Sequence, residues 1–179
     1  MILVEGPSDQ VALETLAKRR GCDLEAMDVQ IVPMGGATNV RVYLDSLRRA
    51  DERILLAGLC DAGEIEMFRK GLMRAGMGKS HDLHDMAERG FFVCHRDLED
   101  ELIRALGTER VLDVFDSDGR LGKFRGFQHQ VAQRELPVEA QLLGFVSNWK
   151  IHFARLFAEA LDENCIPEPL DGVLSHVGC

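Results

Sequence analysis

The apolar residues of the chain form four short runs, each followed by a turn and then by a helical pattern. The runs lie at residues 2–4, 29–34, 54–60 and 91–94. After the first run, for example, apolar residues recur at helical spacing between residues 11 and 17. Strands and helices that alternate at this interval predict a Rossmann-like α/β fold, in which helices flank a four-stranded parallel sheet.

The pattern changes after this α/β part. Residues 111–130 are turn-rich, and residues 137–164 carry apolar residues at the spacing of one or two amphipathic helices. Residues 165–179 contain two prolines and predict an extended segment. We therefore expect an α/β domain at residues 1–107 and, packed on it, a mainly helical C-terminal subdomain at residues 108–179.

The composition is that of a globular chain, with 46% hydrophobic and 28% charged residues. No apolar stretch approaches the roughly 20 residues of a membrane span, so we expect no membrane contact and a cytoplasmic location. The five cysteines are odd in number, widely spaced and without a CxxC pair, which favours reduced thiols, mostly in the core. The net charge of -9 predicts weak binding of nucleic acid unless divalent ions are present.

Acidic residues follow three of the four apolar runs. They are Glu5, Asp9, Asp61, Glu64, Asp97 and Glu99. Because the carboxyl ends of parallel strands meet at one edge of a sheet, we expect these side chains to converge there. Carboxylates close together raise one another's pKa unless a cation lies between them. Oxygen ligands favour Mg²⁺ or Mn²⁺, and two such ions about 4 Å apart are the arrangement that promotes phosphodiester cleavage.

Simpler explanations exist for each of these features alone. An acid such as Asp9 in the first turn of a helix is favoured by the helix dipole, and so are the acids of "DLEDE" at residues 97–101. Gly35 and Gly36 either bring backbone N–H groups near a phosphate or serve a tight turn. Because acids follow three strand ends together, the metal interpretation is the one we prefer.

Four segments, "LVEGPSDQVAL", "VPMGGATNV", "LLAGLCDAGE" and "FVCHRDLEDEL", resemble the TOPRIM domain of topoisomerases, bacterial primases, recombination proteins and OLD-family nucleases. The first and last of them resemble the OLD branch in particular. The resemblance covers residues 1–107. It implies that Glu5 and Asp9 are metal ligands, with Glu5 alternatively a general acid or base, and that Asp61 is the first acid of an Asp-x-Asp motif.

The chain departs from that motif, because Gly63 replaces the second acid and Glu64 follows one position later. Either Glu64 substitutes for the missing acid, or one metal site is weakened. The resemblance also implies that Asp97 and Glu99 help to hold a second metal ion. It further implies a basic residue downstream that meets the scissile phosphate. Lys123 is the candidate for this role, with Arg125 behind it, although a solvated loop lysine is an equally good interpretation of Lys123.

The function expected from these residues is hydrolysis of DNA phosphodiester bonds with two Mg²⁺ or Mn²⁺ ions, with Glu5, Asp61 and Lys123 as catalytic residues. The alternatives are a non-catalytic scaffold that binds DNA or partner proteins, and nucleotidyl transfer. OLD nucleases pair this domain with an ABC-type ATPase, but the sequence has no GxxxxGK[ST] phosphate loop. The expected partner is therefore DNA, and the protein is either a freestanding TOPRIM unit or one that works beside a separate ABC-type ATPase. The aromatic stripe around Trp149 is either core or the surface of a homodimer.

Overall fold

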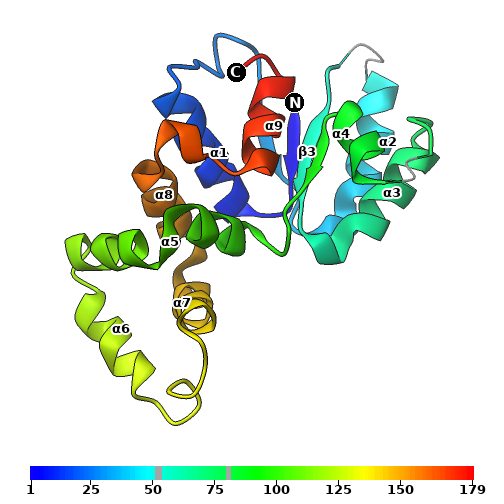
Figure 1. The fold of residues 1–179 in the computed structure, drawn as a ribbon. Coiled ribbons are helices and arrows are strands. Elements are labelled where there is room, and N and C mark those ends of the chain that lie inside the picture. The colour runs from blue at the N-terminus through cyan, green and yellow to red at the C-terminus, as the bar shows by residue number, and fades with distance from the viewer. Residues whose placement is uncertain (51–53, 80–81) are drawn as a thin grey trace.

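The computed structural model describes residues 1–50, 54–79 and 82–179, and its centre is a sheet of parallel strands (Figure 1). The strands are β1 (Ile2–Val4), β2 (Ile31–Pro33), β3 (Ala57–Cys60) and β4 (Phe91–Val93). Their order is β2-β1-β3-β4, and the neighbouring strands pair in parallel. The predicted α/β fold is confirmed, and the carboxyl ends of the strands lie on one edge of the sheet.

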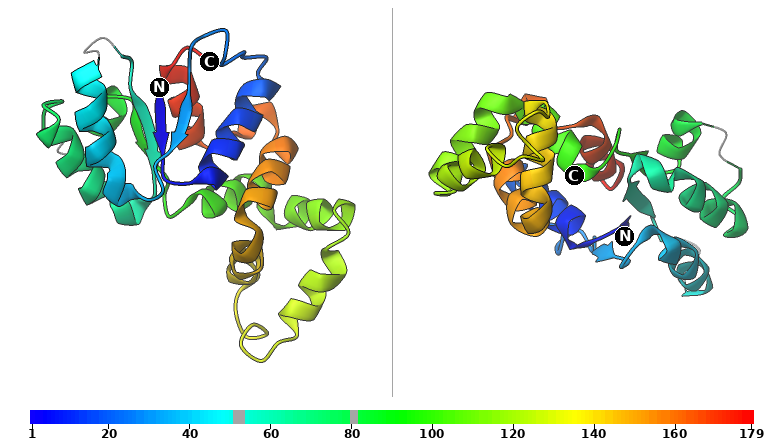
Figure 2. Two further views of the ribbon diagram at one scale, coloured as in Figure 1. Left: turned by 180° about the vertical axis from the view of Figure 1, so that it is seen from behind. Right: turned by 90° about the horizontal axis from the view of Figure 1, so that it is seen from below.

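Helices cover both faces of the sheet (Figures 1 and 2). The helices of the described residues are α1 (Pro7–Arg19), α2 (Val40–Ala50), α3 (Ile65–Arg74), α4 (Leu83–Glu88), α5 (Leu98–Ser117), α6 (Leu121–Gln128), α7 (Val138–Val146), α8 (Lys150–Ala160) and α9 (Glu168–His176). Of these, α6 and α7 lie beyond the edge of the sheet (Figure 1). Short 3₁₀ helices lie at η1 (Ala37–Asn39), η2 (Ala62–Glu64), η3 (Ser147–Trp149) and η4 (Glu163–Cys165). Within the described residues, no helix combines the length and the apolar character that crossing a membrane requires.

The two faces of the sheet support two separate hydrophobic cores. Successive side chains of a strand point to opposite faces, so Ile2 and Val4 lie in one core and Leu3 lies in the other. Helices α1, α5, α8 and α9 contribute to the first core, and α2, α3 and α4 to the second. These cores hold the strand ends, and the loops that follow them, in fixed positions.

The C-terminal part of the chain returns to the sheet. Helix α5 bends at Gly107, whose φ of 74° interrupts the helix, and then continues to Ser117. Further along the chain, α8 packs against α1, and α9 packs against β3 and β4. The first core therefore contains residues from both sides of Gly107. The division into domains at residues 1–107 and 108–179 stays a prediction.

The expectation of an extended segment at the C-terminus is wrong, because residues 168–176 form α9. Pro167 lies at the N-cap, and the helix starts with Glu168 and Pro169. Proline is well tolerated in the first turn of a helix, since its missing N–H has no helical partner there. The two prolines therefore start a helix, and their presence alone does not predict an extended chain.

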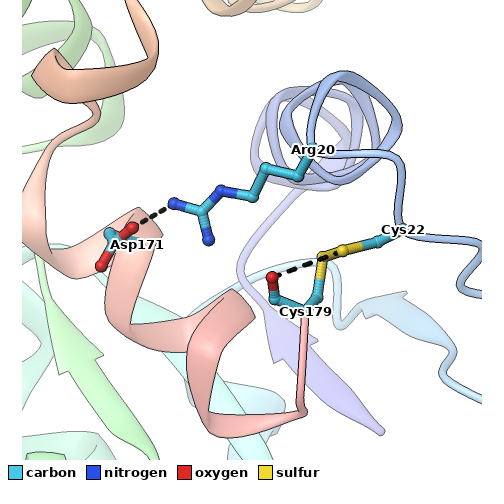
Figure 3. Close-up of a disulfide and its surroundings, with 4 residues drawn as sticks. All are labelled: Arg20, Cys22, Asp171 and Cys179. Atoms are coloured by element: carbon cyan, nitrogen blue, oxygen red, sulfur yellow. Dashed lines mark hydrogen bonds and ion pairs between the residues drawn. A yellow bond between two sulfur atoms is a disulfide. The ribbon is translucent and has the colours of Figure 1, made fainter.

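The expectation of reduced cysteines is also wrong for two of the five. Cys22, just after α1, and Cys179 form a disulfide across a sequence separation of 157 (Figure 3). An ion pair between Arg20 and Asp171 lies beside it (Figure 3). The disulfide joins the carboxyl end of α1 to the end of the chain after α9. Only the fold brings these two cysteines together, so their spacing in the sequence gave no signal.

Candidate functional site

Acids that follow three neighbouring strands come together at the carboxyl edge of the sheet. Glu5 directly follows β1, and Asp61 directly follows β3. The backbone N–H of Asp61 donates a hydrogen bond of 2.8 Å to Oε1 of Glu5. Glu5 is thus held against the end of the adjacent strand, as expected for residues at the same edge of a parallel sheet.

Asp61 lies at the centre of this group. Burial raises its pKa, and the charges of Glu5, Asp9, Asp97 and Glu99 raise it further, to about 7. These four acids come from the loop after β1, from α1 and from the start of α5. Residues that are far apart in the sequence therefore act on one carboxylate, and their mutual repulsion is the kind that a divalent cation relieves.

Asp9 lies in the first turn of α1 and also beside the other acids. It is only 8% exposed, and its Oδ2 accepts a hydrogen bond of 2.8 Å from the N–H of Gly6, which caps α1. Burial raises the pKa of Asp9 to about 6; the Gly6 hydrogen bond opposes this rise, and the charges of Glu5 and Glu99 add to it. Asp9 thus lies in the first turn of α1, where the helix dipole favours an acid, and this position does not exclude a place for Asp9 in the acidic group.

Glu5 is subject to the same environment. Burial raises its pKa, the N–H of Asp61 opposes this effect, and the charge of Glu64 adds to it. Glu64 follows Gly63 in η2, and its Oε2 is buried without a hydrogen-bond partner. Glu64 thus lies near Glu5. In the sequence it directly follows Gly63, which replaces the second acid of the Asp-x-Asp motif.

Asp97 and Glu99 lie at the start of α5. Asp97 is the N-cap, and its Oδ1 accepts a hydrogen bond of 2.8 Å from the N–H of Asp100. Glu99 is 5% exposed; its Oε2 is 2.9 Å from Nζ of Lys150, and its Oε1 is buried without a hydrogen-bond partner. A buried carboxylate oxygen without a partner is costly, so this oxygen is available to a further ligand.

Lys150 is a candidate site residue that the sequence pattern did not indicate. It is the first residue of α8, and α8 packs against α1. Burial alone would lower the pKa of Lys150, but the hydrogen bond and charge of Glu99, and then the charges of Asp97 and Asp61, raise it overall. In the sequence Lys150 is one polar position of an amphipathic pattern, and only the return of α8 to the sheet brings it to the acids.

Lys123 and Arg125 lie elsewhere. Both are at exposed positions of α6, which packs on α5 and α7. Arg125 hydrogen-bonds to Gln128 at 2.9 Å. Figure 1 shows α6 beyond the edge of the sheet, separated from the strand ends by α7 and the start of α5. Their contact with a phosphate stays a prediction, but the lysine that contacts the acids is Lys150.

Gly35 and Gly36 form the turn after β2. Both have positive φ, of 73° and 118°, which glycine adopts far more readily than other residues. The N–H of Gly36 donates a hydrogen bond of 3.0 Å to the carbonyl oxygen of Glu5. The tight-turn interpretation thus explains both glycines, and this N–H holds the loop after β1 in place.

A cavity of about 320 Å³ opens beside Glu99 and Lys150. One wall is the segment between β4 and α5, and the other wall is α7 with η3. The lining residues are Arg96, Asp97, Glu99, Ala140, Leu143, Gly144, Ser147 and Lys150. The cavity therefore has two cations, Arg96 and Lys150, beside two of the carboxylates, which is a suitable environment for an anionic group next to a cation site.

The acidic group fits a divalent metal in its chemistry but not in its present side-chain positions. Among the described residues, no three His, Cys, Asp or Glu side chains converge closely enough to hold an ion. Several of the acids instead accept backbone hydrogen bonds, as Glu5, Asp9 and Asp97 do. The unpartnered oxygens of Glu64 and Glu99 and the raised pKa values favour a cation, which would require some of these carboxylates to turn towards it.

The chain is similar to proteins of one family. Residues 1–62 match the family described as overcoming lysogenization defect (OLD) protein-like, TOPRIM domain. The C-terminal region of the Xanthomonas campestris pv. campestris OLD protein has a similar structure, with a TM-score of 0.70 and 21% identity over 98% of this chain and 92% of that chain. No curated protein matches the sequence.

The C-terminal region of the Burkholderia pseudomallei OLD protein is also similar, with a TM-score of 0.66 and 21% identity over 98% of this chain and 94% of that chain. Both likenesses extend through the C-terminal helices, whereas the family match ends at residue 62. The helical part after Gly107 is therefore part of the shared fold. Residues 1–62 are therefore similar to an OLD-like TOPRIM domain, and the chain as a whole has the fold of these OLD C-terminal regions.

Proposed function

We propose that the chain cleaves phosphodiester bonds of DNA with Mg²⁺ or Mn²⁺ bound by the carboxylates at the edge of the sheet. The family match supports a metal-dependent activity on nucleic acid in general. The observation that carries the specific proposal is the position of Asp61. Its pKa is raised by burial and then by acids from two other strand ends. The repulsion among these acids destabilises the metal-free protein, and a bound cation would relieve it.

Six residues would hold the ions in this proposal, and each contributes carboxylate oxygen. They are Glu5, Asp9, Asp61, Glu64, Asp97 and Glu99. Ions at this position would supply a water molecule that loses its proton more readily, and positive charge at the phosphate oxygens. The donor set contains only oxygen, which suits magnesium and manganese better than zinc.

Lys150 has the role that the sequence assigned to Lys123. Its ammonium group lines the cavity beside Glu99 and can donate hydrogen bonds to a phosphate oxygen there. Glu99 holds Lys150 in position before the substrate binds. Glu5 remains the candidate general acid or base, because it lies beside Asp61 and its pKa is raised by burial.

A non-catalytic scaffold is the second candidate. Gly63 stands where the related motif has an acid, and the carboxylates do not converge on one point within the described residues. A scaffold of this kind would bind DNA or partner proteins without cleaving them. A separate ABC-type ATPase, a homodimer and a cytoplasmic location remain predictions.

Incubation of supercoiled plasmid with the full chain and Mn²⁺ or Mg²⁺ tests the proposal. We expect conversion to nicked or linear DNA, with loss of this activity in EDTA and in Asp61→Ala. Glu109→Gln is a matched control, because Glu109 is an exposed acid of α5 outside the acidic group. Intact supercoils at high protein concentration, or equal cleavage by Asp61→Ala, would favour the scaffold.

A further inference from the structure

A basic segment lies on the other side of α7 from the candidate site. Residues 121–134 contain Lys123, Arg125 and Arg134 and no Asp or Glu, although the chain has 30 acidic and 21 basic residues and a net charge of -9. We call this segment the basic arm. It comprises α6 and the turns that follow (Figure 1). Figures 1 and 2 show that it projects beyond the same edge of the sheet from which α1 and α5 start, the edge of the carboxylates.

The cations of α6 point away from the protein core. Phe124 is fully buried, and its ring packs on Phe115 and Phe145 with centroid distances of 5.2 and 5.3 Å. Lys123 and Arg125 flank Phe124 in the helix and are therefore exposed. Arg125 bonds to the neutral side chain of Gln128, so its charge is not neutralised by this contact.

The arm is held in one conformation by a buried amide. Gln141 of α7 is 6% exposed, and its Oε1 accepts a hydrogen bond of 2.6 Å from Nε2 of Gln128. Its Nε2 donates to the carbonyl oxygens of Gln133 and Leu136, at 2.8 and 3.1 Å. A buried amide with three hydrogen bonds fixes the turns after α6. The cations are thus presented on a rigid support and not on a free loop.

Helix α7 lies between the arm and the cavity at the acids. Gly144 of α7 lines the cavity, and a Cβ placed on Gly144 would lie 3.3 Å from the ring of Phe127 in α6. Packed helices have axes about 10 Å apart, so the arm lies roughly one helix layer from the cavity wall. Duplex DNA rises about 3.4 Å per base pair, and one helix layer corresponds to about three base pairs.

We propose that the basic arm binds the phosphate backbone of duplex DNA about three base pairs from the bond that the carboxylate site cleaves. This inference rests on the proposed function. A chain of net charge -9 repels a polyanion over most of its surface, and a segment with cations and no acids is where the backbone can approach. Arg134 is paired with Glu135 at 3.3 Å, so Lys123 and Arg125 carry most of the interaction.

The test measures the affinity of the full chain for a fluorescent 30-base-pair duplex as a function of salt. Calcium replaces the catalytic ion, because it takes the same oxygen ligands. The double variant Lys123→Ala/Arg125→Ala removes two phosphate contacts. We expect the slope of log Kd against log salt to fall by about 2, and binding at about 0.1 M salt to weaken roughly 50-fold. The matched control is Lys18→Ala/Arg74→Ala, which removes two exposed cations at the far ends of α1 and α3.

Gly126 of α6 allows charge to be added as well as removed. A Cβ at this position would meet no atom within 4 Å, so a new side chain extends from the exposed surface. We expect Gly126→Lys to tighten binding several-fold and Gly126→Glu to weaken it, with unchanged or higher melting temperatures because glycine is a poor helix former. Affinities within twofold of wild type for all three arm variants would overturn the proposal.

Plasmid cleavage by the same variants separates this inference from the proposed function. If wild type cleaves DNA and the arm variants bind and cleave as the control does, the arm proposal is wrong and the nuclease proposal stands. If wild type binds duplex through the arm but does not cleave in Mg²⁺ or Mn²⁺, the nuclease proposal is wrong and the arm is retained as a DNA-binding surface.

Discussion

The substitution Asp61→Asn is expected to stabilise the metal-free protein at alkaline pH. The change keeps the shape of the side chain and removes its charge. Asp61 makes no side-chain capping bond to η2, so the substitution costs no hydrogen bond at that cap. It removes the repulsion from Glu5, Asp9, Asp97 and Glu99, which together with burial raises the pKa of Asp61.

The sign and the size of the change in the free energy of unfolding follow from the pKa of Asp61. A folded-state value of about 7, against an ordinary value of 3.8, means that the folded protein holds the proton more tightly than the unfolded chain. The stability that the protonated carboxyl provides is fully present below pH 3.8 and is lost as the pH rises through about 7. The full shift corresponds to about 4 kcal/mol, and partial exposure of Asp61 reduces this to about 2 kcal/mol.

Thermal unfolding in EDTA at pH 5 and pH 8 measures the effect. For a chain of this size, about 2 kcal/mol corresponds to a rise in Tm of roughly 4–8 °C for Asp61→Asn at pH 8. At pH 5 we expect less than about half of this stabilisation by Asp61→Asn. The reason is that the wild-type protein loses most of the stability provided by protonated Asp61 above pH 5. Glu109→Gln is the control and should leave Tm unchanged. A lower Tm for Asp61→Asn at pH 8, or an equal rise at both pH values, would refute the reasoning.

Two other predictions concern Lys150 and the disulfide. Lys150→Ala should slow plasmid cleavage roughly 100-fold, as expected for the loss of one charged donor at a reacting phosphate, while Lys150→Arg keeps part of the rate; cleavage by Lys150→Ala at the wild-type rate would exclude the proposed role. Cys22→Ser, or reduction of the bond to Cys179, should lower the free energy of unfolding by up to about 5 kcal/mol, because the disulfide closes a loop of more than 150 residues. Equal urea midpoints with and without reductant would contradict this.

The sequence was sufficient to predict the sheet and the edge at which the acids gather. The strands of the sheet are short apolar runs bounded by turns, and each is followed by a helical pattern, so local signals agree with the overall fold. Glu5 and Asp61 follow such strands directly, and their positions are fixed once the strands pair in parallel. These residues could therefore be assigned to one edge without knowledge of any side-chain contact.

The contacts that α8 and α9 make when they pack back onto α1 and the sheet could not be predicted in this way. Lys150 reaches Glu99 only because α8 packs against α1, and Cys22 reaches Cys179 only because α9 covers the sheet beside α1. Both contacts join residues that are separated by long stretches of sequence, and no local pattern encodes them. The C-terminal helix differs in kind, because proline at a helix start and proline in an extended segment look alike in the sequence.

Calorimetric titration of the metal-free full chain with Mn²⁺ tests the central claim most directly, because it does not depend on cleavage. The account predicts binding to two sites in the wild-type chain, and loss of this binding in Glu5→Ala, whose carboxylate lies against the end of β3. No detectable binding to the wild-type chain, or the same binding to wild type and Glu5→Ala, would contradict the claim that these carboxylates form a divalent-metal site.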